Sequence, residues 1–435
     1  MHIDFDQHFS LEALTGDYKT LLRCKFDLFK NNSYLAAGSD RLDRWAFEKQ
    51  LNQHLRAIHR KVLQDRWEFS PFLERSIPKA NGEDRIISIA TIRDTLVQRA
   101  LYKYLYPIVD PLLGDCCVAY RRRLGVHEAV SRIRHAFDNG FVHVLDADIR
   151  AFFDSLDHTI FLEKLHPIEM DPRAHKLVEA YIRTPRVLSS DRDQADNAKP
   201  LARYPRSIRS VGLPQGGVIS GMLANLFLTG LDEEMGARKA IHVRYADDFL
   251  VCCRTAPEAN SAHSRAQNAL AGLGLNLNTD KTQVSNASNG VDFVGFRLAP
   301  GCTRVRAANI SKFKGRIREI IETHVPTRRL SNDISHLARR LSYTIEGPVN
   351  EIEKYGLAEH PYRRSWSGFY RIVDDEKQIK TLDNWIRKQI SLYAWQTHRQ
   401  KITAQDMQAA KLPSLYGAIW KARRPTPRVA EISLL

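Results

Sequence analysis

The sequence has few cysteines and no long apolar run, and both absences narrow the classes of protein to consider. Its six cysteines among 435 residues show neither zinc-ligand spacing nor a secreted disulfide framework. We therefore expect reduced thiols in a cytoplasmic protein. No run of about 18 apolar residues could span a membrane, and the N-terminus lacks the basic and apolar regions of a signal peptide. The 16 histidines are scattered, which favours structural or surface roles over metal binding.

Acidic residues are outnumbered, and the imbalance is uneven along the chain. The formal net charge is +15, and residues 301–435 contain 25 Lys and Arg against 13 Asp and Glu. Most of the positive excess therefore lies in the last third. A basic surface is typical of a protein with a polyanionic partner, most often nucleic acid, although charged helix faces are also common without one.

Two stretches rich in β-branched and aromatic residues carry acids suited to chemistry. Residues 242–253, HVRYADDFLVCC, predict a tight hairpin with Asp247 and Asp248 at its tip, and residues 141–150, FVHVLDADIR, end an apolar strand with Asp148. Adjacent side chains of a strand face different ways, so one acid of the pair is expected to support the other. Carboxylates from two strands can hold hard cations that leave positions open for phosphate oxygens. Together they indicate nucleotidyl transfer, whereas an Asp-Asp turn alone is ordinary turn chemistry.

Other stretches predict local structure around these acids. Residues 40–64 have apolar positions at helical spacing with Asp40 as a candidate cap, and residues 91–113 also predict a helix. Asn81-Gly82 between two extended runs predicts a hairpin. Residues 212–225, GLPQGGVISGMLAN, predict a Gly-rich turn running into an apolar helix, and the polar residues 184–210 predict a loop.

Together these stretches resemble the reverse transcriptase family, and within it the group II intron-like bacterial branch. DIRAFFDSLDH is similar to the family's A motif, LPQGGVISGMLANLFL to its B motif and RYADDFLV to its C motif; GLGLNLNTDKTQVSN and VDFVGFRL are similar to its D and E motifs. The resemblance implies an α+β right-hand polymerase with fingers, palm and helical thumb. The implied parts are an N-terminal helical extension (1–61), fingers (62–140), the first part of the palm (141–162), a fingers region or insertion (163–211), the second part of the palm (212–300) and a basic, maturase-like thumb (301–435).

The resemblance also implies an RNA-directed DNA polymerase, in which a primer 3′-hydroxyl attacks the α-phosphate of a deoxynucleotide. Two Mg²⁺ ions, with Mn²⁺ as an alternative, are expected at Asp148, Asp247, Asp248 and the backbone carbonyl of Ile149. Lys281 is expected to protonate the leaving pyrophosphate, and Phe153 to lie beneath the sugar and refuse a 2′-hydroxyl. The expected nucleotide contacts are Lys79, Arg85, Arg121, Phe153, Gln215 and Gly216, and the expected primer grip is Phe293, Gly295 and Phe296. Lys79 and Arg85 also fit ordinary exposed charges on a hairpin, and Lys281 also fits a solvated lysine after a turn.

Two departures from the family pattern stand near the expected site. Where relatives often have an aromatic-Arg-Pro-Gly turn, this chain has Tyr120-Arg121-Arg122-Arg123, so Arg121 matches but the turn after it does not. The usual Ser-Pro at the start of the B-motif helix is Ser220-Gly221 here, which affects the expected local helix geometry.

The implied partners are an RNA template, a DNA or RNA primer, deoxynucleotides and, as a further candidate, a dedicated non-coding RNA. No cysteine follows Cys302, so the DNA-endonuclease finger of mobile intron proteins is not expected. This favours a stand-alone enzyme, with antiphage defence first among its cellular roles and CRISPR adaptation or an intron-derived housekeeping or repair role as alternatives. Two other functions stay open. One is a non-catalytic splicing cofactor or RNA-binding protein, which would not need three clustered acids; the other is an RNA-dependent RNA polymerase, which Phe153 argues against.

Overall fold

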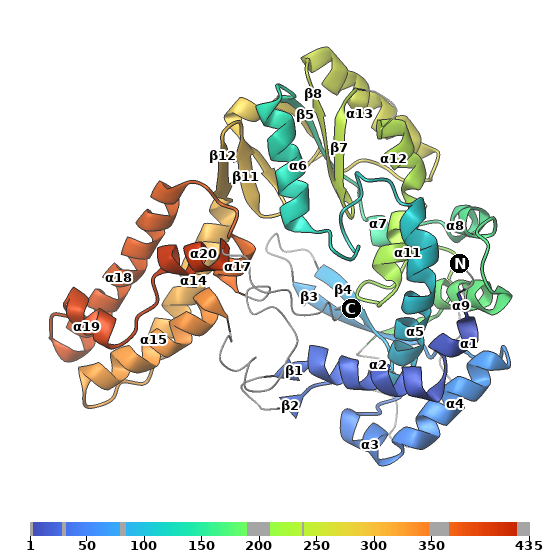
Figure 1. The fold of residues 1–435 in the computed structure, drawn as a ribbon, viewed down its shortest axis with the longest axis horizontal. Helices are drawn as coiled ribbons and strands as arrows, with labels where there is room; N and C mark the ends of the chain where they lie inside the picture. The colour runs from blue at the N-terminus through green and yellow to red at the C-terminus, as the bar shows by residue number, and fades with distance from the viewer. Residues whose placement is uncertain are drawn as a thin grey trace. The chain divides into compact units, whose positions relative to one another are not determined.

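The computed structural model describes residues 3–27, 32–78, 84–188, 209–236, 239–347 and 365–423. The chain divides into two compact units, drawn in Figure 1. The first comprises Met1–Ala129 and Phe141–Ser285, and the second Val130–Gly140 and Asn286–Leu434. Lys79, the Asn81-Gly82 tip and most of the predicted 184–210 loop lie outside the described residues.

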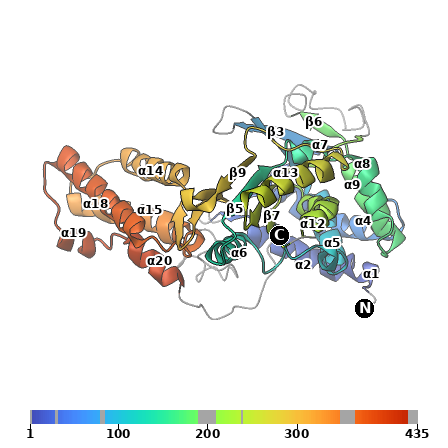
Figure 2. The same ribbon diagram turned by 90° about the horizontal axis from the view of Figure 1, so that it is seen from above.

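A four-stranded sheet in the order β7-β8-β5-β9 forms the centre of the first unit. β8 pairs antiparallel with both β7 and β5, and Figure 2 shows α13 lying along these strands. Leu145 and Ala147 of β5 belong to the large hydrophobic core of the unit. Asp146 and Asp148 alternate with them, so the acids point to the opposite face of the sheet. The strands are β5 (His143–Asp148), β7 (Ile241–Tyr245), β8 (Asp248–Cys253) and β9 (Gln283–Asn286).

A second sheet of the first unit contains the predicted fingers hairpin. β3 (Phe72–Pro78) and β4 (Asp84–Ile89) pair antiparallel, as the sequence predicted. β6 (Arg186–Leu188) pairs parallel with β3, so the segment predicted to be a loop contributes a strand. The following helix, α5 (Ile92–Val109), confirms the helix predicted after Thr91, whose side chain caps it by accepting from the backbone amide of Asp94 at 3.1 Å.

The predicted helix over residues 40–64 is two helices in the structure. α3 (Arg44–Lys49) ends at Gln50, and α4 (Leu51–Leu63) follows it directly. The cap predicted at Asp40 is wrong, because Asp43 accepts from the amide of Ala46 at 2.8 Å and starts α3. Asp40 instead accepts from the amide of Leu42 and from Arg93. The apolar residues keep a helical spacing across Gln50, so the sequence pattern did not predict the break between α3 and α4 there.

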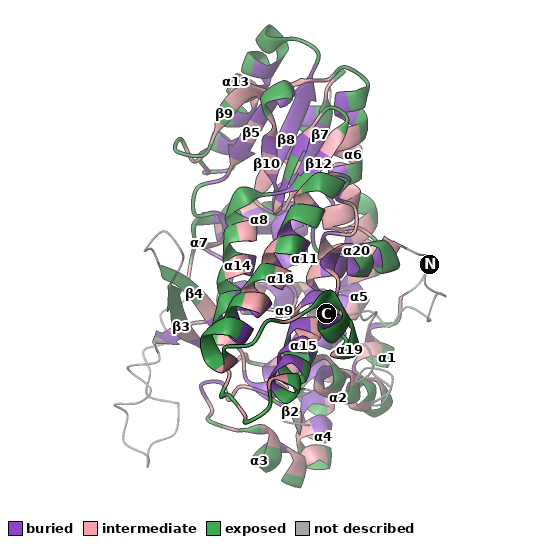
Figure 3. Ribbon diagram, turned by 90° about the vertical axis from the view of Figure 1, so that its left-hand side faces the viewer, coloured by how far each residue is buried: buried purple, intermediate pink, exposed green. Residues whose placement is uncertain are grey.

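The remaining elements of the first unit pack around these sheets. α12 contacts β7, and α13 contacts β5 and β8. Figure 3 shows the strands of the central sheet in purple, since they are buried, whereas α13 presents green, exposed residues outward. These elements are α1 (Phe5–His8), α2 (Leu11–Cys24), β1 (Phe26–Asp27), β2 (Asn32–Ser33), η1 (Asp110–Leu112), α7 (Phe152–Ser155), α8 (His158–Leu165), α9 (Pro172–Ile182), α11 (Ser220–Phe227), α12 (Thr229–Gly236) and α13 (Ala256–Ala271). α6 (Val126–Asp138) begins in the first unit and ends in the second.

The second unit combines a small sheet with the basic helices predicted near the C-terminus. Buried Asp333 holds part of it together, since it accepts from the backbone amide of Thr327 at 2.8 Å, from Tyr393 at 2.9 Å and from Nε2 of His398 at 2.7 Å. Arg340 donates to the backbone carbonyl of Ile320 and so ties α15 to α14. The elements are η3 (Ala287–Asn289), β10 (Val291–Phe293), β11 (Phe296–Ala299), β12 (Cys302–Val305), α14 (Ala307–Glu322), α15 (Leu330–Glu346), α17 (Trp366–Phe369), α18 (Glu376–His398), α19 (Ala404–Ala409) and α20 (Leu415–Arg423).

Candidate functional site

Strand register brings the three predicted catalytic acids to one end of the central sheet. Asp148, the last residue of β5, is the cross-strand partner of Asp248, the first residue of β8. The turn between β7 and β8 is Ala246-Asp247, with φ of +62° at Ala246. The predicted hairpin is therefore present, but its tip is Ala246-Asp247 and not Asp247-Asp248. The amide of Ile149 donates to the carbonyl of Asp247 at 3.1 Å, which ties the turn to the end of β5.

The acid cluster carries more negative charge than its neighbours balance. Burial, together with the charges of Asp146, Asp148 and Asp247, raises the pKa of Asp248 to about 8. Burial and the Asp148 charge likewise raise the pKa of Asp247. Lys281 donates from Nζ to Oδ2 of Asp148 at 2.9 Å. Oxygen ligands from two strands and a turn, held close enough to perturb one another, form the donor set that hard divalent cations prefer.

Asp146 is a member of this cluster that the sequence prediction missed. It stands two residues before Asp148 in β5, so both side chains lie on the same face of the strand. Its charge is the largest contribution from another residue to the raised pKa of Asp248. The alternation of acids in LDAD was the signal that could have identified it.

A cavity of about 670 Å³ in the first unit contains most of the predicted nucleotide contacts in its wall. Phe153 lines it and is half-buried, whereas Phe152 is only 2% exposed and packs against Phe227. Only one of the two adjacent rings is therefore placed to meet a ligand. The predicted residues in the wall are Arg85, Phe153, Gln215 and Gly216, and residues that were not predicted include Lys25, Tyr34, Tyr120 and Gly221.

The Gly-rich turn before α11 is tied to the hairpin strand β4. Arg85 donates from Nε to Oε1 of Gln215 at 3.3 Å, and Gln215 donates from Nε2 to Asp154 at 3.2 Å. The carbonyl of Gln215 accepts from the amide of Ser88 at 2.8 Å. Gly216 has φ of +93°, which favours glycine. These contacts fix the amide of Gln215 at the cavity wall.

Arg121, a predicted nucleotide contact, is bonded within its own loop in this structure. Its guanidinium donates to the Asp110 carboxylate from Nε at 2.8 Å and also to the carbonyls of Gly114, Cys117 and Asp110. It is absent from the wall of the cavity. In this structure the donors of Arg121 hold its own loop, and its role as a nucleotide contact stays a prediction.

The predicted primer-grip side chains are also placed differently from expectation. Phe293 is 1% exposed and Phe296 is fully buried, where its ring packs against Tyr370 at 5.2 Å between centroids. They flank a two-residue turn, Val294-Gly295, with φ of +41° and +94°. Both aromatic rings belong to the core of the second unit, and the predicted primer grip stays a prediction. We therefore propose that the turn Val294-Gly295 is the part of the motif that contacts the primer.

Arg244 connects the turn that carries Asp247 to the elements around it and was not predicted as a site residue. It is fully buried, and it donates to both oxygens of Asp232, at 2.7 Å and 2.5 Å. Its Nη1 donates to Oδ1 of Asn225 at 3.0 Å and to the carbonyl of Ala246 at 3.1 Å. One side chain thus joins α11, α12 and the turn that carries Asp247.

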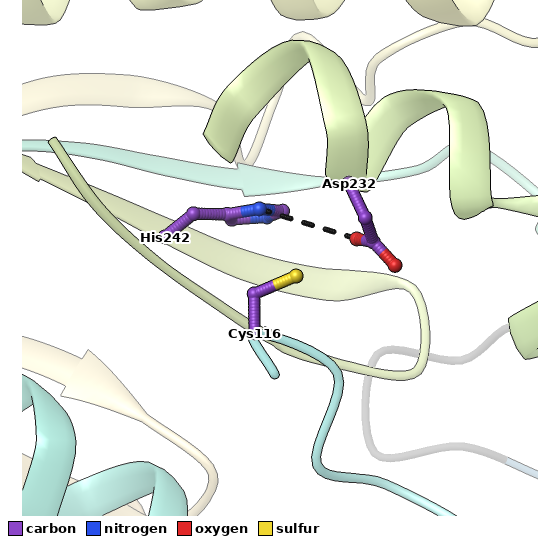
Figure 4. A group of neighbouring side chains, drawn as sticks. All are labelled: Cys116, Asp232 and His242. Carbon is purple, nitrogen blue, oxygen red and sulfur yellow. Dashed lines mark ion pairs between the residues drawn. The ribbon is translucent and has the colours of Figure 1, made fainter. Parts of the chain in front are cut away.

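Beside this network, Cys116, Asp232 and His242 lie together in the buried interior (Figure 4). Their ligand atoms are all within 4.8 Å of one another, a grouping that the scattered cysteines and histidines of the sequence did not predict. Nδ1 of His242 is 4.0 Å from Asp232, and burial lowers the pKa of His242 to about 4, so the ring is neutral. Because Arg244 already neutralises Asp232, we interpret this group as part of the packed interior.

Comparison with known proteins now decides the family. Residues 77–298 match the family described as reverse transcriptase (RNA-dependent DNA polymerase), which is half of the chain. The chain belongs to the reverse transcriptase family. The matched range covers both acidic strands, the Gly-rich turn and β4 of the hairpin, but only the last two residues of β3.

The chain is also similar to individual known proteins. The chain is 24% identical over 300 residues to Protein YkfC of Escherichia coli K12, covering 60% of this chain and 75% of YkfC. It is 25% identical over 231 residues to the group II intron-encoded protein LtrA of Lactococcus lactis subsp. cremoris, covering 51% of this chain and 35% of LtrA. A solved telomerase of Candida albicans aligns with a TM-score of 0.41 at 14% identity, covering 87% of this chain and 65% of the telomerase. The chain therefore spans only about a third of LtrA.

Several predictions are thereby confirmed at the level of the family. The chain is a group II intron-like reverse transcriptase with an α+β fold, and its enzyme class is RNA-directed DNA polymerase. An RNA template and divalent metal ions go with that class. Among the described residues, no helix combines the length and apolarity needed to cross a membrane.

Proposed function

We propose that this chain extends a primer 3′-hydroxyl with deoxynucleotides on an RNA template, using Mg²⁺ held by Asp148, Asp247 and Asp248. The observation that carries the proposal is the register that pairs Asp148 with Asp248 beside the Asp247 turn. The carbonyl of Ile149, which follows Asp148 directly, is a further candidate ligand. Bound Mg²⁺ would supply positive charge to the attacking and leaving oxygens.

The protein's own residues position the substrate and handle protons in this proposal. Arg85 and Gln215, joined at 3.3 Å, bind the nucleotide, and the backbone at Gly216 allows its close approach. Phe153 packs beneath the deoxyribose. Lys281 has a side chain that is 62% exposed beside Asp148, and its ammonium donates a proton to the departing pyrophosphate. Lys79 is kept as a triphosphate contact on sequence grounds alone.

The part of the second unit from Gly301 onward is proposed to act as the thumb, holding the template–primer duplex through phosphates and 2′-hydroxyls. Its exposed basic residues support this proposal, and they include Lys312 and Arg316 of α14 and Arg339 of α15. We keep the fingers, palm and thumb boundaries predicted from the sequence as part of the same proposal. The cellular role, with antiphage defence first, rests on the sequence resemblance alone, and the proposed cytoplasmic location rests on the number and spacing of the cysteines.

Primer extension with purified protein tests the reaction. A labelled primer on an RNA template should lengthen with deoxynucleotides and Mg²⁺, stop on chelation and resume when Mg²⁺ or Mn²⁺ is added back. As a control for template identity, the same primer annealed to RNA that has been digested with ribonuclease should not be extended. Extension that persists in excess chelator would contradict the assigned use of metal. Sequencing the nucleic acid that copurifies would then identify the natural template.

A further inference from the structure

Tyr120 stands out in the wall of the nucleotide cavity because its backbone is strained. Its φ is +56°, a left-handed conformation that is uncommon for a bulky residue. The ring is nevertheless 45% exposed and lines the same cavity as Phe153 and Gln215. Strain of this kind persists where the surroundings fix a side chain in a required position.

Bonds on both sides of Tyr120 impose this conformation. The bridge between Cys117 and Arg244 lays the preceding segment beside β7, where the amide of Val118 donates to the carbonyl of Arg244 at 3.0 Å. Asn225 donates to the carbonyl of Ala119 at 2.8 Å, and Arg121 is bonded to Asp110. The segment therefore delivers Tyr120 next to the turn that carries Asp247. Consistent with this, burial and the charge of Asp247 raise the pKa of Tyr120.

Gly221 provides the space that the ring of Tyr120 occupies. A Cβ at Gly221 would lie 2.4 Å from Cγ of Tyr120, and 2.6 Å and 2.7 Å from its two Cδ atoms. No other residue fits there unless the ring moves. Gly221, which departs from the family pattern, is therefore in contact with Tyr120, the aromatic residue that precedes Arg121 and the altered turn.

We propose that Tyr120 is a specificity-determining residue whose ring packs against the base pair being formed between template and incoming nucleotide. The proposal rests on the proposed polymerase function. One side of the ring lies on Gly221, the ring is partly exposed in the cavity and Asp247 is close by, so an aromatic surface faces the place where a nucleotide would bind. Stacking on an aromatic ring tolerates every base, since each base has a π-face. Correctly paired geometry fills this space, and a mispair displaced from it loses the contact.

Single-nucleotide insertion by the full chain tests the proposal. Tyr120→Ala should raise the KM for the correct deoxynucleotide by at least ~10-fold, and should reduce the ratio of correct to mispaired insertion by at least ~5-fold. Tyr120→Phe should retain both values, because the ring and not the hydroxyl makes the contact. The choice between deoxyribose and ribose, assigned to Phe153, should not change. Equal losses for matched and mispaired nucleotides, or wild-type KM and mispair ratio in Tyr120→Ala, would overturn the proposal.

Gly221→Ala displaces the ring of Tyr120 while keeping the tyrosine itself. It therefore tests whether the effect of Tyr120→Ala comes from the position of the ring or from a general loss of folding. It should reproduce the loss in the wild-type background but add little when combined with Tyr120→Ala, where the space is free. Gly236→Ala is the matched control, since a Cβ there meets nothing within 4 Å. Fully additive losses, or a harmless Gly221→Ala, would contradict the contact. If the wild-type chain polymerises and these outcomes fail, only the role of Tyr120 is wrong; if the wild-type chain does not polymerise, the proposed function itself fails.

Discussion

Replacing Arg244 by Met should destabilise the chain and loosen the catalytic turn. Its partner Asp232 has a side chain that is 3% exposed, so the substitution leaves a carboxylate buried without its counter-ion. Breaking a buried pair on one side costs about 3–5 kcal/mol, to which lost hydrogen bonds to Asn225 and Ala246 add. For a unit of this size we expect the melting temperature to fall by roughly 10 °C.

The double variant Arg244→Met with Asp232→Leu separates stability from activity. Replacing both partners of a buried ion pair by apolar residues is often neutral, so most of the lost stability should return. The bond from Arg244 to the carbonyl of Ala246 stays absent, so kcat should remain at least ~10-fold below wild type while KM changes little. Thermal unfolding and steady-state primer extension measure the two effects. Recovery of full kcat in the double variant would refute the idea that Arg244 positions the turn, and an undiminished melting temperature in Arg244→Met would refute the buried-pair argument.

Three further predictions concern other parts of the molecule. Phe153→Val should raise the incorporation of ribonucleotides relative to deoxynucleotides by at least ~10-fold, or ~1.4 kcal/mol. Phe152→Val, at a buried position, should instead lower the stability of the chain by about 1 kcal/mol or more and leave the sugar choice unchanged. Equal discrimination in Phe153→Val and wild type would contradict the role of Phe153 in excluding the 2′-hydroxyl. Arg339→Gln should reduce the steepness with which log affinity for the template–primer falls against log salt concentration by roughly 0.7–0.9. An unchanged slope would show that Arg339 contacts no phosphate. Arg340 is bonded to α14, so its replacement should lower stability instead. Burial alone would raise the pKa of Asp333, but its hydrogen bonds outweigh burial and hold that pKa well below its usual range. Asp333→Asn should therefore be less stable than wild type above the unfolded-state pKa of about 3.9, with the difference shrinking as pH falls further; a pH-independent difference in urea unfolding would contradict this.

The candidate site residues that could be predicted from the sequence are those whose position in the fold follows from a local sequence pattern. Asp148, Asp247 and Asp248 follow from strand patterns, and register then brings them together. Phe153 and Gln215 lie in recognisable motifs near these acids, so their positions close to the acids could also be predicted. The hairpin at residues 72–89 follows from turn chemistry between two extended runs.

The misses have a common physical cause, which is that the partners are distant in sequence. The ion pair between Arg121 and Asp110 was not predicted from the motif that contains Arg121. Arg244 looks like an ordinary polar residue of a strand, and only the fold reveals a buried carboxylate opposite. Phe296 reads equally well as a surface grip or as core, and the choice depends on Tyr370, far along the chain. Gly221 and Tyr120 lie 101 positions apart in the sequence, so their contact could not be predicted from either motif alone.

The central claim is tested most directly by RNA-templated primer extension with Asp247→Ala combined with Asp248→Ala. The account predicts loss of extension in Mg²⁺ to background, with RNA binding within about twofold of wild type, because affinity should reside mainly in basic residues elsewhere in the chain. Glu233→Ala, which removes an exposed carboxylate of α12, should leave both properties unchanged. Extension by the double variant at a rate near wild type would contradict the assignment of this turn as the active site.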